Sequence, residues 1–136
     1  MNQNIFKAYD IRGKYPLEIN RPAVRIITQA LITSFSLKKK KIKIVVGHDA
    51  RKSSQSLYRE VLKTAAADAR VKEVFAAELI TTPTLYLLVN MLPADGGLTI
   101  TASHDPKNYN GVKMVGPRAV PISGKDIYEV VSLLSH

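Results

Sequence analysis

The sequence lacks three features, and each absence excludes a class of protein. Its 136 residues include no cysteine, which excludes a disulfide framework, thiolate metal sites and cysteine catalysis. Apolar stretches run for only a few residues, as at 85–89, whereas a membrane-spanning helix needs roughly 20. The first residues also lack the continuous apolar core of a signal peptide. We therefore expect a single cytoplasmic domain that has no membrane partner.

Acidic residues are scarce as well, because 11 Asp and Glu face 20 Lys and Arg, for a net charge of +9. The densest basic cluster, the lysine run, spans residues 38–43. It has no interleaved aromatic residues, and the chain has no zinc-finger spacing, so nucleic acid is not the expected partner. We interpret the run as a solvated helix end, with Lys43 on the wet face of an edge strand. A positive field would also suit a small phosphorylated substrate.

Hydrophobic spacing predicts helices that alternate with short strands. Helical patterns begin at Pro22, after Ser53 or Ser54, at Pro83 and after Ser123. Apolar runs at 44–46, 74–77, 98–101 and 112–115 predict four strands, with a turn at 110–111 before the last. Residues 9–20 form a polar connecting stretch. The pattern predicts one three-layer α/β/α domain over residues 1–136, with a mixed, mostly parallel four-stranded sheet whose last strand is antiparallel.

The most informative segment is the loop after the third predicted strand, residues 101–113, TASHDPKNYNGVK. Ligands of open α/β sheets bind at the carboxyl ends of strands. The loop places the Ser103 hydroxyl beside the His104 imidazole, with cations at Lys107 and Lys113. A phosphoserine carries about −1.5 to −2 charges and needs such cations. We therefore predict that Ser103 holds a transferable phosphoryl group. An acyl-transfer triad is disfavoured because adjacent side chains seldom face each other and no nucleophile elbow is present.

Three motifs carry a family resemblance. Residues 101–106 with 109–113 closely resemble the active-site serine loop of the α-D-phosphohexomutases. Residues 6–13, FKAYDIRG, resemble the N-terminal signature of this family in its phosphomannomutase/phosphoglucomutase form, and residues 47–54, GHDARKSS, resemble its Gly-x-Asp-x-Arg-x-Ser loop. The motifs follow the family's order and cover essentially the whole chain. The resemblance extends to only the first of the family's four domains, so we expect the catalytic-serine domain I with the later domains absent.

The resemblance implies a role for each of five residues. Ser103 would be phosphorylated, would pass its phosphoryl group to a glucose or mannose phosphate through a hexose 1,6-bisphosphate intermediate, and as phosphoserine would be one ligand of Mg²⁺. The remaining Mg²⁺ ligands are expected from an absent domain. His104 and Lys113 are candidates for general acid/base catalysis, and Tyr9 and Arg12 for substrate binding. The partners are a hexose phosphate and the remaining domains of the same enzyme, so the isolated domain is expected to be inactive as a mutase.

Other residues of the motifs carry structural expectations. We expect Asp49 and Arg51 to brace a loop as a pair, and Lys107 to be solvated. The family usually has Asn where this chain has Asp105, and a carboxylate beside a phosphoserine is unfavourable unless a cation or hydrogen bond offsets it. Two alternatives stay open. One is a phosphoglucosamine mutase domain, and the other is a non-enzymatic basic module that binds phosphorylated ligands or nucleic acid through residues 38–43.

Overall fold

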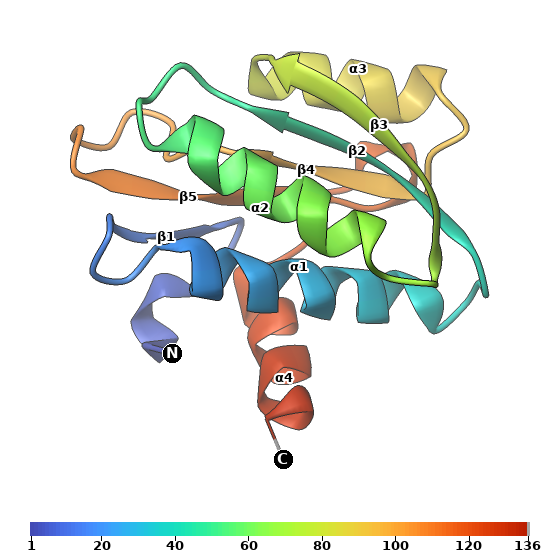
Figure 1. Ribbon diagram of the computed structural model, residues 1–136, viewed down its shortest axis with the longest axis horizontal. Coiled ribbons are helices and arrows are strands. Elements are labelled where there is room, and N and C mark those ends of the chain that lie inside the picture. Colours follow the sequence, from blue (N-terminus) through green and yellow to red (C-terminus); the bar gives the residue numbers. More distant parts are fainter. Residues whose placement is uncertain (136) are drawn as a thin grey trace.

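A computed structural model describes residues 1–135 and shows one mixed sheet flanked by helices (Figure 1). The strand order is β1-β5-β4-β2-β3. The strands are β1 (Ile11–Lys14), β2 (Ile42–His48), β3 (Val71–Leu79), β4 (Gly96–Ile100) and β5 (Tyr109–Val115). β2 pairs in parallel with β3 and β4, β5 is antiparallel to β4, and β1 is antiparallel to β5. The predicted fold class and the antiparallel orientation of the last predicted strand are confirmed, whereas the predicted count of four strands is wrong.

The additional strand, β1, lies in the stretch that we interpreted as a polar connection. It is a four-residue edge strand with one neighbour, so a single apolar residue, the fully buried Ile11, is enough to anchor it. The predicted turn at 110–111 is also wrong, because both residues lie within β5. Gly111 instead permits a close approach, since a Cβ there would lie 2.0 Å from the Ile11 carbonyl oxygen. A glycine beside a strand pattern can mark a turn or a close approach of two backbones, and the sequence alone does not distinguish the two.

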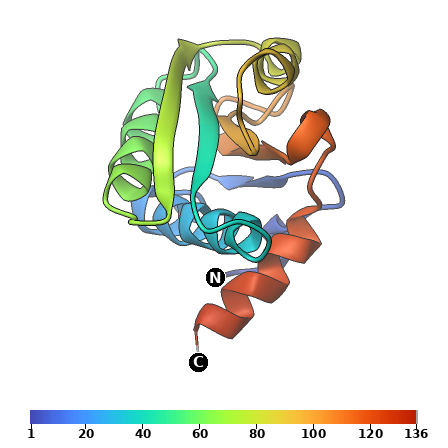
Figure 2. The ribbon, with the colours of Figure 1, turned by 90° about the vertical axis from the view of Figure 1, so that its right-hand side faces the viewer.

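Helices cover both faces of the sheet. Helices α1 (Arg21–Ser36) and α2 (Ser54–Ala66) lie on one face, and α3 (Thr82–Met91) lies on the other (Figures 1 and 2). Helix α4 (Gly124–Leu134) packs against α1, and two short 3-10 helices, η1 (Gln3–Ile5) and η2 (Pro117–Ala119), complete the described elements. Side chains of a strand alternate between faces, so Ile44 and Val46 enter the larger core while Val45 packs with Leu85 of α3.

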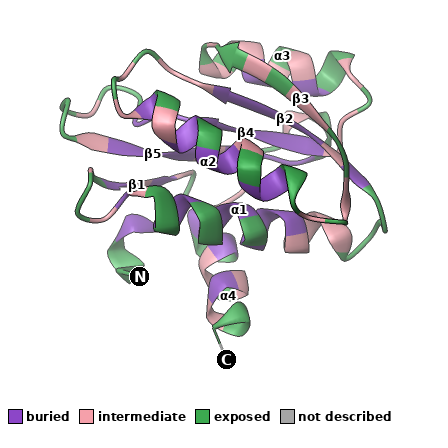
Figure 3. Cartoon of the chain, viewed as in Figure 1, coloured by how far each residue is buried: buried purple, intermediate pink, exposed green. Residues whose placement is uncertain are grey.

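The central strand β4 is buried along its whole length (Figure 3). Its two neighbours, β2 and β5, are also mostly buried, so the sheet forms a rigid support for the loops at its ends. The loop after β2 and the loop after β4 leave the sheet at the same edge, because these strands are parallel. Chain segments 50 residues apart therefore meet there, and we call this side the carboxyl edge.

The lysine run lies at the opposite side, which we call the amino edge. Its residues follow α1 and lead into β2 (Figure 1). Lys43 lies on β2, between β4 and β3, so its predicted place on an edge strand is wrong. No helix among residues 1–135 combines the length and apolar character that crossing a membrane requires.

Candidate active site

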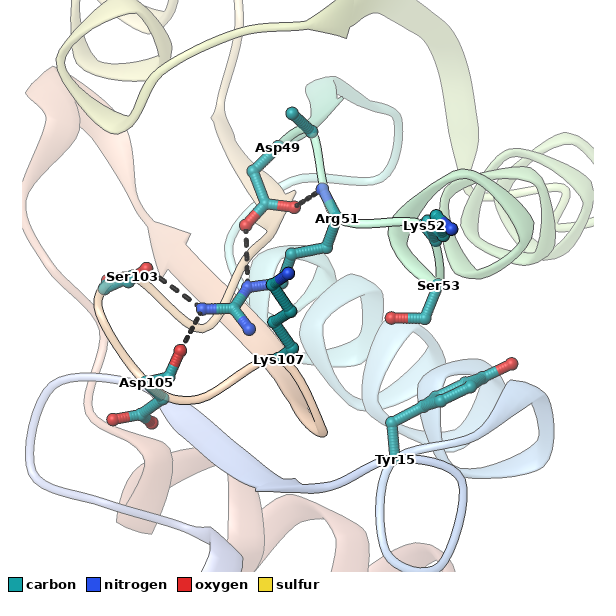
Figure 4. Close-up of a pocket in the computed structure, with 9 residues that line it drawn as sticks. Tyr15, Asp49, Arg51, Lys52, Ser53, Ser103, Asp105 and Lys107 are labelled. Carbon is teal, nitrogen blue, oxygen red and sulfur yellow. Dashed lines mark hydrogen bonds and ion pairs between the residues drawn. The ribbon is translucent and has the colours of Figure 1, made fainter.

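A pocket of about 800 Å³ opens at the carboxyl edge of the sheet, between the loop after β2 and the loop after β4 (Figure 4). Both loops belong to motifs that the sequence analysis singled out. The lining residues are Tyr15, Asp49, Ala50, Arg51, Lys52, Ser53, Ser103, Asp105 and Lys107. The pocket therefore combines three hydroxyl groups with five charged side chains, the kind of polar groups that orient a small ligand.

Ser103 has an exposed side chain and an unusual backbone. Its φ angle is 55°, in the left-handed region that costs a non-glycine residue about 1–3 kcal/mol. Neighbouring groups hold it on both sides. Its amide donates to the Thr101 hydroxyl at 3.0 Å, and its carbonyl oxygen accepts from Arg51 at 3.1 Å. The surrounding structure thus stabilises a conformation that presents Ser103 to the pocket.

Arg51 connects the two loops, as Figure 4 shows. Its Nε lies 3.3 Å from an Asp49 carboxylate oxygen, so the predicted pairing of these two residues is confirmed. The guanidinium also donates to carbonyl oxygens of the loop after β4, including that of Asp105 at 2.7 Å. Asp49 is itself tied to the sheet, because its amide donates to the Ile100 carbonyl oxygen. The loop conformation thus depends on a residue that precedes it by about 50 positions.

Asp105, the departure from the family pattern, has a cationic partner. Its carboxylate lies 3.2 Å from Arg12 Nη1, and the Nε of the same guanidinium lies 3.1 Å from Asp10. Partial burial disfavours the charge on Arg12, but the two carboxylates outweigh this and raise the pKa of the guanidinium. The carboxylate beside Ser103 is therefore offset by a cation, which is the condition that its position requires.

The predicted site residues do not all converge on the pocket. Of the five, the described part of the chain places Ser103 in the lining, whereas Tyr9, Arg12, His104 and Lys113 lie outside it. Arg12 reaches the serine loop through Asp105. His104 is exposed on the same loop, and Lys113 lies on β5 opposite Thr99. Tyr9 precedes β1 and is 70% exposed. The assignment of these residues to catalysis and substrate binding stays a prediction.

Sequence reasoning missed two residues of the lining, Lys52 and Tyr15, whereas it named Lys107 as a cation of the serine loop. Lys52 and Lys107 are exposed and form no ion pair within residues 1–135, so they give the pocket positive charge. Lys52 had a signal, since it lies inside the residue 47–54 motif, and Lys107 was predicted as a solvated residue. Tyr15 had none. It reaches the site because its amide donates to the Asn108 carbonyl oxygen at 2.8 Å.

The donor set offered by this chain does not fit a complete Mg²⁺ site. This ion prefers several oxygen ligands in octahedral geometry. No cluster of three or more acidic or histidine side chains suited to a metal is found among the described residues. Asp49 is directed to Arg51, and Asp105 is directed to Arg12. Both carboxylates of the lining are therefore paired, so a Mg²⁺ ion bound by a phosphorylated Ser103 would need further ligands, either water or groups from other domains.

Comparisons with known proteins agree on one family. The model for "Phosphoglucomutase/phosphomannomutase, alpha/beta/alpha domain I" matches residues 3–135. A relative described as phosphohexose mutases from Xanthomonas campestris is 42% identical over 118 residues, which are 87% of this chain and 25% of the relative. A phosphomannomutase from Klebsiella pneumoniae is 42% identical over 119 residues, 88% of this chain and 72% of that sequence.

Solved structures show the same likeness in three dimensions. The crystal structure of a phosphoglucomutase/phosphomannomutase family protein from Burkholderia thailandensis superposes with a TM-score of 0.82 at 26% identity. The match covers 99% of this chain and 31% of that protein. The chain thus spans about a quarter of the length of the first curated relatives and under a third of this structural neighbour.

Proposed function

The chain belongs to the phosphoglucomutase/phosphomannomutase family, as its α/β/α domain I, and on this basis we propose that Ser103 carries the phosphoryl group that the enzyme transfers. The reaction would move phosphate between the 1- and 6-positions of a glucose or mannose phosphate. The observation that carries this proposal is the position of Ser103. It is an exposed serine, held in a left-handed conformation, on a pocket with Lys52 and Lys107, two cations that have no ion-pair partner within residues 1–135.

The proposed chemistry has two transfers. In the first, the bond between phosphorus and the Ser103 oxygen breaks while a sugar hydroxyl oxygen bonds to phosphorus. The sugar proton passes to a base, and the freed Ser103 oxygen takes up a proton. The product is a hexose 1,6-bisphosphate. In the second, the other phosphoryl group returns to the Ser103 oxygen, which gives up its proton, and the sugar oxygen that it leaves takes up a proton. Phosphoryl transfer depends mainly on positioning and on stabilising charge, and cations around the serine support both.

We assign the proton transfers to His104 and Lys113 as candidates. His104 is adjacent to Ser103 on an exposed loop, so a substrate in the pocket could meet its imidazole. Lys113 is half-buried on β5, opposite Thr99 of β4, the strand that leads into the serine loop. Arg12 and Tyr9 are proposed as substrate contacts on the β1 side. Arg12 suits this role because a guanidinium binds phosphate through two parallel hydrogen bonds.

Mg²⁺ belongs to the proposal only as a cation that phosphoserine would bind together with ligands from outside this chain. The same reasoning makes the remaining domains of the enzyme the partner of this one. We therefore expect the chain alone to show negligible mutase turnover. Robust conversion of glucose 1-phosphate by the chain alone would contradict that expectation.

Phosphate uptake tests the proposal directly. The chain, joined to the remaining domains of a phosphohexomutase so that the other Mg²⁺ ligands are supplied, would be incubated with glucose 1,6-bisphosphate and Mg²⁺, and its intact mass and phosphopeptides would be followed. We expect one phosphate, located at Ser103, and none on Ser103→Ala. Ser132→Ala removes a hydroxyl on α4, far along the chain from the serine loop, and should take up phosphate like the wild type. Equal uptake by Ser103→Ala, or none by the wild type, would refute the proposal.

A further inference from the structure

The guanidinium of Arg51 has an acceptor for every one of its donors. Nη1 donates to the carbonyl oxygens of Pro106 at 2.7 Å and Tyr109 at 3.1 Å. Nη2 donates to the carbonyl oxygens of Ser103 at 3.1 Å and Asp105 at 2.7 Å. Nε faces the Asp49 carboxylate. An arginine side chain has five N–H groups, and here four donate hydrogen bonds while the fifth faces a carboxylate.

Four of these five contacts reach one short segment, residues 103–109. They hold its backbone carbonyl groups, so they restrain the course of the loop whatever side chains it carries. The loop after β2, which carries Arg51, is also restrained. Asp49 accepts from the Arg51 amide at 3.0 Å and from the Ser54 hydroxyl at the start of α2. The Arg51 side chain is only 15% exposed. The loop is thus fastened to the end of β2 through one cation.

Ser103 is the residue on which this fastening has the greatest effect. Its left-handed backbone is unfavourable for a serine, and it persists only where contacts determine it. Thr101 restrains the amide side of Ser103, and Arg51 restrains the carbonyl side. Without the guanidinium, the peptide after Ser103 is free to rotate toward the ordinary right-handed region. The side chain would then leave the backbone in a different direction.

We propose that Arg51 is a positioning residue for phosphoryl transfer at Ser103. It touches no reacting atom but sets the backbone that directs the Ser103 oxygen into the pocket. This inference rests on the function proposed above. A misplacement of about 1 Å in a reacting group lowers the rate of a positioned reaction by roughly 100-fold. Lysine cannot replace this arginine, because an ammonium has three donors on one nitrogen and cannot span four carbonyl groups.

The experiment compares phosphate uptake from glucose 1,6-bisphosphate by the wild type and by Arg51→Lys, each joined to the remaining domains of a phosphohexomutase as in the test above. We expect uptake on Ser103 to slow by about 100-fold in Arg51→Lys. Arg70→Lys is the matched control. Arg70 also pairs with an aspartate, Asp68 at 2.8 Å, but lies between α2 and β3 at the amino edge. It should take up phosphate at the wild-type rate.

Two further measurements separate positioning from a loss of folding. Hydrogen exchange of amides 101–109 should accelerate in Arg51→Lys while exchange in β2 and β4 stays slow. Added guanidinium ion should restore part of the uptake in Arg51→Ala, because it can occupy the vacated site, and should restore none in Ser103→Ala. A wild-type rate in Arg51→Lys, or a rate that falls only with the fraction unfolded, would overturn the inference.

The outcomes also distinguish this inference from the proposed function. If the wild type takes up phosphate and Arg51→Lys does so equally fast, the function stands and the positioning role fails. If the wild type takes up no phosphate, the proposed function fails. Arg51 would then have only a structural role, even if amide hydrogen exchange in its loop is slow.

Discussion

The two edges of the sheet both carry positive charge, but they hold it in different ways. At the carboxyl edge, Arg51 donates four hydrogen bonds to fixed carbonyl oxygens and pairs with Asp49, and Arg12 lies between two carboxylates. At the amino edge, the lysines project from an exposed segment. There, Lys39 forms an ion pair with Asp95, and Lys41 donates to the Ala69 carbonyl oxygen.

This difference shows that net charge is a poor guide to where a basic protein binds its ligand. The lysine run is the densest basic cluster in the sequence, yet exposed lysine contacts contribute only about 0–1 kcal/mol each. The arginines of the carboxyl edge are dispersed along the chain, and the fold gathers them around one loop. Charged side chains with fixed hydrogen-bond partners fix the conformation of a site, whereas solvated charged side chains contribute mainly a long-range electrostatic field.

The largest expected effect comes from detaching β1, the strand that brings Arg12 to the carboxyl edge. In Gly111→Ala the new Cβ would lie 2.0 Å from the Ile11 carbonyl oxygen, so the β1–β5 pairing must separate. We expect a loss of about 3 kcal/mol in the free energy of unfolding, measured by urea denaturation. In the control Gly116→Ala the nearest atom lies 3.9 Å away, and the change should stay within about 0.5 kcal/mol. Equal stabilities would show that β1 is not held by this close approach.

A second test asks whether a charged side chain with fixed partners also stabilises the fold away from the site. Glu60 on α2 is buried and receives hydrogen bonds from Arg25 at 3.0 Å and Arg21 at 3.4 Å. The Arg25 hydrogen bond is the main reason that the pKa of Glu60 lies below its ordinary value of 4.5, although burial opposes this. Its contribution is therefore complete above pH 4.5 and is lost as the pH falls through the lowered pKa.

Glu60→Gln should accordingly destabilise the protein by about 1 kcal/mol at pH 7 and make its unfolding free energy less sensitive to pH between about 5 and 3. Thermal unfolding across this range measures the effect. Glu129→Gln makes the same charge change at an exposed position on α4 and should retain the wild-type pH profile. If the unfolding free energy of Glu60→Gln depended on pH as that of the wild type does, the Glu60 ion pairs would not stabilise the fold.

A third, smaller effect concerns Arg12 alone. Asp105→Asn removes one of its two carboxylate partners and frees Nη1 to bind an anion, while Nε stays paired with Asp10. We expect affinity for inorganic phosphate to rise about 2- to 5-fold at low salt, since a part-exposed pair is worth up to about 1 kcal/mol. Titration followed by ³¹P NMR would measure this, with Asp126→Asn on α4 as the control for net charge. An equal gain in both variants would assign the effect to overall charge.

The smallest effect is expected at the amino edge. Replacing Lys38 and Lys40 by Ser should change the unfolding free energy by less than about 0.5 kcal/mol and leave phosphate uptake at Ser103 unaltered. A gel-shift assay with RNA and DNA tests the alternative interpretation of the lysine run. Salt-sensitive binding that this double variant abolishes would favour the basic-module hypothesis and would reverse the contrast between the two edges.

Much of the fold could be predicted because its signals are local. The four helices, the strands β2 to β5 and the serine loop all lie where spacing and turn residues place them. The errors have physical causes. β1 is a short edge strand anchored by one buried isoleucine, so it has no alternating pattern to detect. Ser53 lies at the N-cap position, just before the first residue of α2, but makes no capping hydrogen bond, and its hydroxyl accepts from Asn110 instead.

The sequence by itself determined the α/β class, the family resemblance and the identity of the candidate nucleophile, because each depends on neighbouring residues. Only the tertiary structure decided how Ser103 is held. Arg51 lies 52 positions before Ser103, and Arg12 lies 93 positions before Asp105. No periodicity connects such residues. They meet because parallel pairing of β2 with β4 brings both loops to one edge, and because antiparallel β5 carries the chain back to β1.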